Sequence, residues 1–225
     1  MSTFIKNNVL RFLNLVIRRN RFITRMIFGV RVPDSNRIAW DFTTIALKNC
    51  LLRYVSDNSR VLEIGTGSYA ILPIYLARHR NCEITATDLH EEYVDSSRRT
   101  AQLNGVDLNI IRSDLYGAID GSYDIIFWNS VYIPRHTGTT LGIDRLSTAD
   151  SDWCGGETGI EEIERFLRDS HDYLAPGGKI LLGFNPVYLS KELVEEAYKR
   201  NGWSISATHR TLFNPSRVFV LRKTD

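Results

Sequence analysis

The sequence is poor in cysteine and has no long apolar run. Its three cysteines, Cys50, Cys82 and Cys154, lie too far apart for a zinc site or a disulfide framework, so we expect no metal ion. Such sparse cysteine suits a reducing compartment, and the cytoplasm is the expected location. Charged residues interrupt every apolar stretch well before the roughly 20 residues that a membrane span needs. These absences exclude a disulfide-bonded secreted scaffold and a membrane-spanning chain from the expected classes.

Acidic residues are missing from the first 31 positions. This segment holds seven basic residues and a charge of +7, so the chain's net charge of +2 leaves −5 for the remainder. Residues 3–19 place apolar side chains at helical spacing and basic or polar ones on the other side, and the segment from Phe22 to Val30 repeats this character. Arg11 and Asn14 interrupt the apolar core that a secretory signal would need.

Three interpretations of this basic segment stay open. It forms a helix that packs on its own domain or on a partner chain, it offers a surface at residues 1–31 for anionic lipid or RNA, or it is an organelle-targeting peptide. Its low serine content counts against targeting. We therefore divide the chain into a basic amphipathic helical extension, residues 1–32, and a main domain, residues 33–225. A hydrophobic content of 43% supports a full core for that domain.

The main domain begins with a predicted helix. The sequence Val32-Pro33-Asp34-Ser35 is a turn and helix-start signal, in which Asp34 or Ser35 can cap the helix. The segment from Arg37 to Val55 is then predicted to be helical.

A glycine turn lies between a strand and a helix in the next part of the chain. Val61 to Ile64 predicts a buried strand, Gly65-Thr66-Gly67-Ser68 a turn, and Ile71 to Leu76 a helix. Glycines reach positive φ without steric cost, and a helix N-terminus supplies unpaired N–H groups, so the backbone can approach a ligand closely. The next predicted strand, Glu83 to Asp88, ends in an acid that can bind a ribose diol.

The turn differs from a dinucleotide-binding fingerprint. The third glycine is missing, because Tyr69 and Ala70 follow Ser68. Glu63 lies just before the turn, where a carboxylate would repel a pyrophosphate but suits a cationic ligand that carries an amino acid.

This combination resembles the S-adenosylmethionine-dependent methyltransferases with a Rossmann-like fold, whose first motif is Glu/Asp-x-Gly-x-Gly. The resemblance implies an α/β three-layer sandwich with a seven-stranded, mostly parallel sheet that ends in an antiparallel C-terminal strand pair. It also implies S-adenosyl-L-methionine as cofactor. The cofactor-binding residues implied at the first two strands are Glu63, Gly65, Thr66, Gly67, Asp88 and Leu89. The alternative is a Rossmann-like domain without this cofactor.

A third strand, Asn109 to Ile111, leads to Asp114 and Leu115. In the families that the chain resembles, an acid at this position hydrogen-bonds the adenine amine and the next residue packs on the ring. The resemblance therefore adds Asp114 and Leu115 to the cofactor site. The alternative for Asp114 is an ordinary turn residue.

The fourth predicted strand, Tyr123 to Trp128, ends at the sequence Asn129-Ser130-Val131-Tyr132. This sequence resembles the Asn-Pro-Pro-Tyr motif of N-methyltransferases that act on glutamine, adenine or guanine amino groups. The resemblance implies that Asn129 and the Ser130 carbonyl orient the acceptor nitrogen toward the methyl group, and that Tyr132 packs on the planar acceptor. Asn129 also counts among the cofactor-binding residues. Serine and valine replace both prolines, and an ordinary strand-end turn and a core aromatic are the alternatives for Asn129 and Tyr132.

The segment from Arg135 to Asp152 is predicted to be a long polar loop that covers the substrate. The sequence after it, from Asp152 to Ile160, resembles the Asp-Gly-Gly-x-x-Gly segment of release-factor glutamine methyltransferases, with two residues between the acid and the glycine pair. The remaining chain predicts two helices and three strands: a helix from Glu161 to Leu174, a turn from Ala175 to Lys179, a strand from Ile180 to Phe184, a helix from Lys191 to Lys199, and strands from Trp203 to His209 and Val218 to Arg222.

The expected function is therefore N-methylation of a planar amide or amine in a protein or nucleic acid. Two alternatives remain at this point: O- or N-methylation of a small metabolite, and a non-catalytic cofactor-binding subunit that docks RNA or a membrane through residues 1–31.

Overall fold

The computed structural model describes residues 16–33, 37, 39–144, 149–211 and 214–224. A seven-stranded sheet with the strand order β3-β2-β1-β4-β5-β7-β6 forms its centre. The strands are β1 (Arg60–Ile64), β2 (Glu83–Asp88), β3 (Asn109–Arg112), β4 (Tyr123–Asn129), β5 (Leu174–Phe184), β6 (Trp203–Thr211) and β7 (Asn214–Lys223). The first five pair in parallel, and β7 pairs antiparallel with both β5 and β6. The predicted sheet and its antiparallel end are confirmed.

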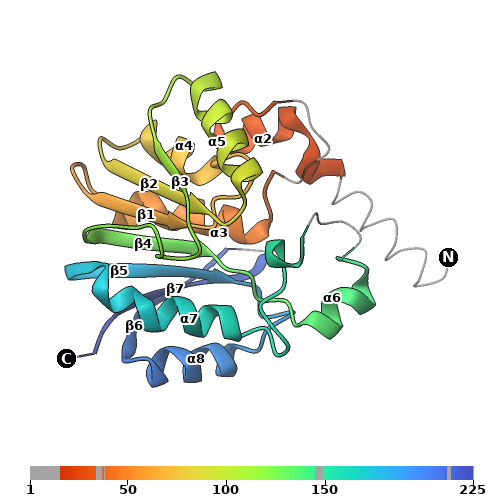
Figure 1. Cartoon of the computed structure of the whole chain (residues 1–225), viewed down its shortest axis with the longest axis vertical. Helices are drawn as coiled ribbons and strands as arrows, with labels where there is room; N and C mark the ends of the chain where they lie inside the picture. The colour runs from red at the N-terminus through yellow and green to blue at the C-terminus, as the bar shows by residue number, and fades with distance from the viewer. Residues whose placement is uncertain (1–15, 34–36, 38, 145–148, 212–213, 225) are drawn as a thin grey trace.

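Helices cover both faces of this sheet (Figure 1). They are α2 (Arg21–Phe28), α3 (Phe42–Tyr54), α4 (Ile71–Ala77), α5 (Glu91–Leu103), α6 (Arg135–Leu141), α7 (Glu161–Asp169) and α8 (Lys191–Arg200). Residues 16–19 are helical as well, and two short 3₁₀ turns are present, η1 (Asp150–Asp152) and η2 (Ser170–Asp172).

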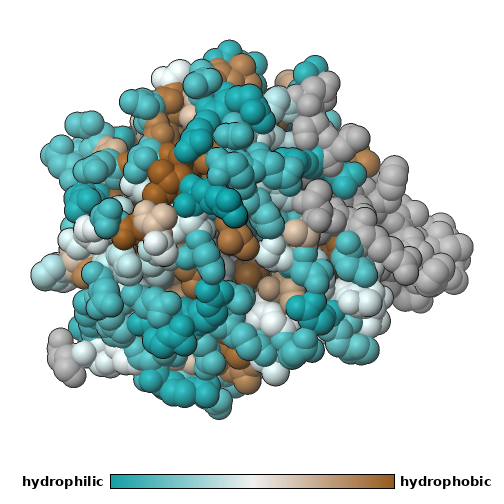
Figure 2. Space-filling view, in the orientation of Figure 1, coloured by the Kyte–Doolittle hydropathy of each residue, from teal (hydrophilic) through white to brown (hydrophobic). Residues whose placement is uncertain are grey.

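Two hydrophobic cores result, one on each face of the sheet. Successive strand residues point to opposite faces, so Val61 packs in the core beneath α3, α4 and α5, whereas Leu62 packs in the core beneath α7 and α8. Both side chains are fully buried. On the molecular face in Figure 2, hydrophilic residues accordingly predominate and apolar ones form small patches.

Helix α3 begins later than the sequence predicts. Its first residue is Phe42 rather than Arg37, and its N-cap is Asp41, whose carboxylate accepts a hydrogen bond from the Thr44 backbone N–H at 2.8 Å. The predicted caps, Asp34 and Ser35, lie outside the described residues. A local cap within the expected helix therefore sets the start of α3.

The prediction of a loop from Arg135 to Asp152 is wrong for the first part of this segment. Residues 135–141 form the short helix α6, and residues 150–152 form η1. Gly138 on α6 lies so close to the indole of Trp153 that a Cβ there would meet the ring at 1.9 Å. Tertiary packing of this kind stabilises a seven-residue helix that has no periodic pattern of its own.

Two further boundaries differ from prediction. Helix α7 ends at Asp169, because the 3₁₀ turn η2 takes over the segment predicted to stay helical. The segment predicted as a turn, residues 175–179, belongs to β5, where the pairing with β4 shifts register between Tyr123 and Ile125.

The described part of the basic extension contacts the main domain. Phe28 and Val30 are buried in the core that contains α3. The Ala39 N–H donates to the Arg18 carbonyl at 3.0 Å, and the Arg18 Nε donates to the Trp40 carbonyl at 2.7 Å. Most of the predicted helix at residues 3–19 lies outside the described residues, and the domain division at residue 32 stays a prediction. Among the described helices, none has both the length and the apolar character needed to cross a membrane.

Candidate active site

A cavity of about 1020 Å³ lies at the carboxyl ends of the parallel strands, where open α/β sheets bind their ligands. The site residues named from the sequence come from four strand ends and the turns that follow them. All of them line this one cavity: Glu63, Gly65, Thr66, Gly67, Asp88, Leu89, Asp114, Leu115, Asn129, Ser130 and Tyr132.

The glycine turn after β1 is fixed against β2. Gly65 and Gly67 have φ angles of 63° and 67°, a region in which glycine is favoured. The Thr66 N–H donates to the Thr87 carbonyl at 2.7 Å, and the Gly67 N–H donates to the Asp88 carboxylate at 2.8 Å. A Cβ on Gly65 would lie 3.0 Å from the Trp128 Nε1, so the turn also needs glycine for space.

Two buried carboxyl groups flank this turn. Glu63 is 4% exposed, and its Oε2 has no hydrogen-bond partner among the described residues. Burial raises the pKa of Glu63 to about 8, although the neighbouring Thr66 side chain opposes this shift and Asp88 adds to it. Burial also raises the pKa of Asp88, whose carboxylate accepts from the His90 N–H at 3.0 Å. A cation placed here would favour the ionised forms of both groups.

Asp114 and Leu115 lie across the cavity, after β3. Leu115 is buried and adopts a φ of 46°, which is uncommon for a residue with a branched side chain. The Asp114 carboxylate pairs with Arg165 on α7 at 3.0 Å. This arginine lies 51 residues away in sequence, and no local pattern identified it as a partner.

Asn129, the last residue of β4, is held by two hydrogen bonds at the wall of the cavity. Its Nδ2 donates to the Asp41 Oδ1 at 3.1 Å and to the Thr44 Oγ1 at 3.3 Å. Its Oδ1 is buried and has no hydrogen-bond partner among the described residues. Because Asn129 lines the cavity, this residue brings one buried, unsatisfied acceptor to the cavity wall.

Ser130 and Tyr132 are more strongly tied to the protein interior. The Ser130 side chain and backbone N–H both donate to the Gly183 carbonyl of β5, at 2.7 and 3.1 Å. Tyr132 lines the cavity but is only 7% exposed, and its hydroxyl lies 3.3 Å from the Thr43 Oγ1. Its ring is 6.4 Å from the Tyr188 ring.

The segment after β4 lines the cavity between Asn129 and α5. Arg135 on α6 pairs with Asp150 and Glu157. Asp152 accepts a hydrogen bond from the Tyr93 hydroxyl of α5 at 2.7 Å. The sequence indicated that this segment covers the site, but the contacts between it and α5 depend on the tertiary fold.

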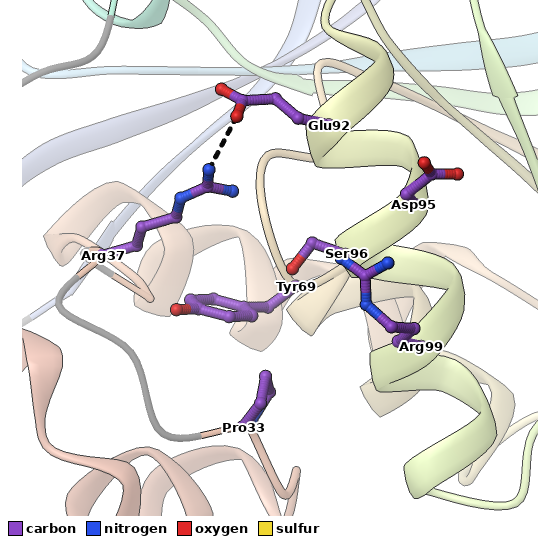
Figure 3. A pocket seen from close by; sticks show the side chains of 7 residues that line it. All are labelled: Pro33, Arg37, Tyr69, Glu92, Asp95, Ser96 and Arg99. Atoms are coloured by element: carbon purple, nitrogen blue, oxygen red, sulfur yellow. Dashed lines mark hydrogen bonds and ion pairs between the residues drawn. The ribbon is translucent and has the colours of Figure 1, made fainter.

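A second, smaller pocket of about 400 Å³ adjoins the first, and Arg37 and Tyr69 line both. Figure 3 shows the Arg37 side chain directed at Glu92 on α5, and their charged atoms are 2.9 Å apart. The Arg37 guanidinium also lies 5.0 Å from the Tyr93 ring centroid. Arg37 thus connects the segment before α3 with the start of α5 at the cavity rim.

Comparison with known proteins identifies relatives of this chain. The family model described as the methyltransferase small domain matches residues 37–143. The chain is 32% identical over 153 residues to the release factor glutamine methyltransferase of Streptococcus pneumoniae, a match that covers 67% of this chain and 54% of that protein. It is 30% identical over 148 residues to a Methanocaldococcus jannaschii protein named as a protein N5-glutamine methyltransferase, with 65% and 73% covered.

A crystal structure of a methyltransferase from Pyrococcus furiosus shares the fold, with a TM-score of 0.66, 22% identity and 96% of each chain covered. The chain spans about half the length of the release factor glutamine methyltransferases of Deinococcus radiodurans and Streptococcus pneumoniae.

Proposed function

Because the chain belongs to the small-domain family of S-adenosylmethionine-dependent methyltransferases, we propose that it transfers a methyl group to the side-chain nitrogen of a glutamine in a protein. The observation that carries this proposal is the unpaired, buried Oδ1 of Asn129, which lies in one cavity with Glu63 and Asp88. A primary amide has N–H donors that match this acceptor. Relatives named for glutamine methylation of release factors and of ribosomal protein uL3 support the acceptor class.

The residues in the cavity fit S-adenosyl-L-methionine. The Glu63 Oε2 has no other partner among the described residues and would face the positive charge of this cofactor, while Asp88 would accept from the ribose hydroxyls. The backbone turn at Gly65 and Gly67 would contact the amino-acid part. Asp114 and Leu115 would bind the adenine, provided that Asp114 shares its carboxylate with Arg165.

The chemistry needs alignment more than base catalysis. The bound cofactor supplies an electrophilic methyl carbon on a sulfonium, so the weakly nucleophilic amide nitrogen needs mainly the right position. Asn129 would accept one N–H of the acceptor, the Ser130 carbonyl would accept the other, and Tyr132 would pack on the amide plane. The nitrogen would gain the methyl carbon as the carbon–sulfur bond breaks, and it would lose one proton to solvent.

The direct test is methyl transfer from tritium-labelled cofactor. We expect label in a purified release factor or in ribosomal protein uL3 from the source organism, and mass spectrometry of the digested protein should locate N5-methylglutamine. A fractionated lysate provides the comparison with RNA, DNA and small molecules. Label that enters only RNA or a metabolite would contradict a glutamine acceptor.

We also propose that the basic extension docks on membranes that contain anionic lipid. On α2, the side chains of Phe22 and Met26 are 73% and 70% exposed, and they lie one helical turn apart. Arg21 and Arg25 flank them, and residues 1–31 contain no acid. Exposed apolar side chains favour a lipid surface over RNA, because a membrane can bury both Phe22 and Met26, whereas RNA bases would stack only on the aromatic Phe22. The cytoplasmic location expected from the sequence stays a prediction.

Vesicle flotation tests this docking. We expect the protein to float with vesicles that contain about 30% phosphatidylserine, an anionic lipid, and not with pure phosphatidylcholine. Serine at Phe22 and Met26 should weaken binding about tenfold or more, since each removes buried apolar area. Serine at Val187, which is 66% exposed elsewhere, is the matched control. Equal binding to both vesicle types, or binding only to an RNA oligomer, would rule out the proposal.

A further inference from the structure

The first turn of α3 holds the acceptor-side residues in place. The Asp41 Oδ1 accepts three hydrogen bonds: from the Thr44 N–H at 2.8 Å, from the Thr44 hydroxyl at 2.8 Å and from the Asn129 Nδ2 at 3.1 Å. Thr43, the residue before Thr44, lies 3.3 Å from the Tyr132 hydroxyl. One turn of helix therefore contacts the side chains of Asn129, at the end of β4, and of Tyr132, which follows it.

This arrangement decides which way the Asn129 amide points. A carboxamide carries donors on its nitrogen and only acceptors on its oxygen, whereas an ionised carboxylate is an acceptor only. If the amide were rotated by 180°, the Asn129 Oδ1 would face the Asp41 Oδ1 without a proton between them. The hydrogen bond to Asp41 thus fixes Nδ2 toward α3 and leaves Oδ1 as the atom without a partner among the described residues.

The local sequence explains why Asn129 needs a hydrogen bond from another element to hold it. Proline would restrict the backbone after Asn129, but Ser130 and Val131 stand there and leave φ free. In this chain, contacts with other elements restrict the conformation of residues 129 and 130 instead. Ser130 is bound to the Gly183 carbonyl of β5, and Asn129 is bound to the cap of α3.

We propose that Asp41 is a positioning residue, which caps α3 and holds the Asn129 amide so that its Oδ1 accepts an N–H from the methyl acceptor. Thr44 supports the same orientation through its hydroxyl, 3.3 Å from the Asn129 Nδ2. The proposal rests on the proposed function for its catalytic consequence. The orientation of the amide can be measured without any acceptor.

The acceptor-independent test uses the side-chain amide signal of Asn129 in ¹⁵N-labelled protein, assigned by its loss in Asn129→Ala. We expect Asp41→Ala to shift this signal and to speed its exchange with water. Ser190→Ala is the matched control, because Ser190 caps α8 by accepting from the Leu193 N–H at 3.1 Å. That variant should leave the Asn129 signal unchanged. If Asp41→Ala changes neither the position of the Asn129 signal nor its exchange with water, the positioning role is wrong, whichever molecule is the methyl acceptor.

Turnover on a release factor then tests the consequence. We expect Asp41→Ala to lower kcat about 10- to 100-fold and to change the dissociation constant of S-adenosylhomocysteine less than about threefold. Asp41→Asn should restore kcat to within a few-fold, because an asparagine oxygen also caps the helix and accepts from the Asn129 Nδ2. Ser190→Ala should lower the melting temperature without lowering kcat.

A double variant separates action through Asn129 from a general loss of structure. Asp41→Ala combined with Asn129→Ala should be no slower than Asn129→Ala alone, because the residue through which Asp41 acts is already gone. A further loss in the double variant would contradict the proposal. If the wild-type protein methylates no glutamine at all, the proposed function fails while the amide signal still decides the role of Asp41.

Discussion

Replacing Asn129 with alanine is expected to lower kcat by about 10²- to 10³-fold, the range found when one preorganised hydrogen-bonding group is removed from an active site. The Asn129 Oδ1 is a buried hydrogen-bond acceptor without a partner among the described residues, and in the proposed mechanism it directs the nitrogen of the substrate at the methyl carbon. Alanine removes this atom and leaves Glu63 and Asp88 in place. Affinity for S-adenosylhomocysteine should therefore change less than about threefold.

Single-turnover kinetics with labelled cofactor measures the first quantity, and titration calorimetry measures the second. Asn201→Ala provides the control, because Asn201 ends α8 and its side chain donates to the Ala197 carbonyl. That variant should keep full turnover. If Asn129→Ala methylates as fast as the wild type, the assignment of the acceptor side is wrong.

The second large effect concerns Glu63 and the pH dependence of cofactor binding. Burial holds the pKa of Glu63 at about 8 in the free protein, so this carboxyl is mostly protonated at pH 7. A bound cation favours the ionised form and lowers that pKa. Binding at pH 7 must therefore release a proton. The dissociation constant should rise up to about tenfold for each pH unit below 8.

Glutamine at position 63 removes both the charge and the titration. At pH 8.5, Glu63→Gln should weaken S-adenosylmethionine binding by about 10- to 100-fold, the cost of one hydrogen bond to a charged group. The pH dependence that remains in the variant comes from Asp88 and from the cofactor's own amino group, and the comparison with wild type cancels both. Calorimetry in two buffers of different ionisation enthalpy measures the number of protons released on binding. At pH 7, the wild type should release about one proton from Glu63, and this proton should be missing in the variant. If the dissociation constant depends on pH in the same way in wild type and in Glu63→Gln, Glu63 does not contact the positive charge of the cofactor.

The sequence predicted the sheet and the glycine turn well because both are local features. Apolar runs such as Tyr123 to Trp128 are typical of strands that are buried on both faces of a parallel sheet. Glycine adopts a positive φ readily, so Gly65 and Gly67 by themselves indicate the turn. Strand order then brings the ends of β1, β2 and β4 to one edge. The site residues assigned to those ends consequently line one cavity.

The start of α3 was not predictable in the same way. The apolar pattern continues upstream toward Arg37, so periodicity alone does not mark Asp41 as the cap. The pattern of Asp41 followed three residues later by Thr44 was the available signal, since each side chain satisfies the other's backbone N–H.

The partners of site residues were least accessible to sequence reasoning. Asp41 and Asn129 are 88 residues apart, and Asp114 and Arg165 are 51 apart. No periodicity or turn rule connects positions at such separations. Only the packing of α3 and α7 against opposite faces of the sheet brings these pairs together.

The hydrogen bonds between Arg18 and residues 39 and 40 connect the basic extension with the segment that leads into α3. Trp40, whose carbonyl accepts from the Arg18 Nε, immediately precedes Asp41. The basic extension is thus hydrogen-bonded to the peptide that precedes the α3 cap, and the cap in turn holds the Asn129 amide. If a membrane binds α2, its effect on the Asn129 amide would have to pass through this short series of contacts.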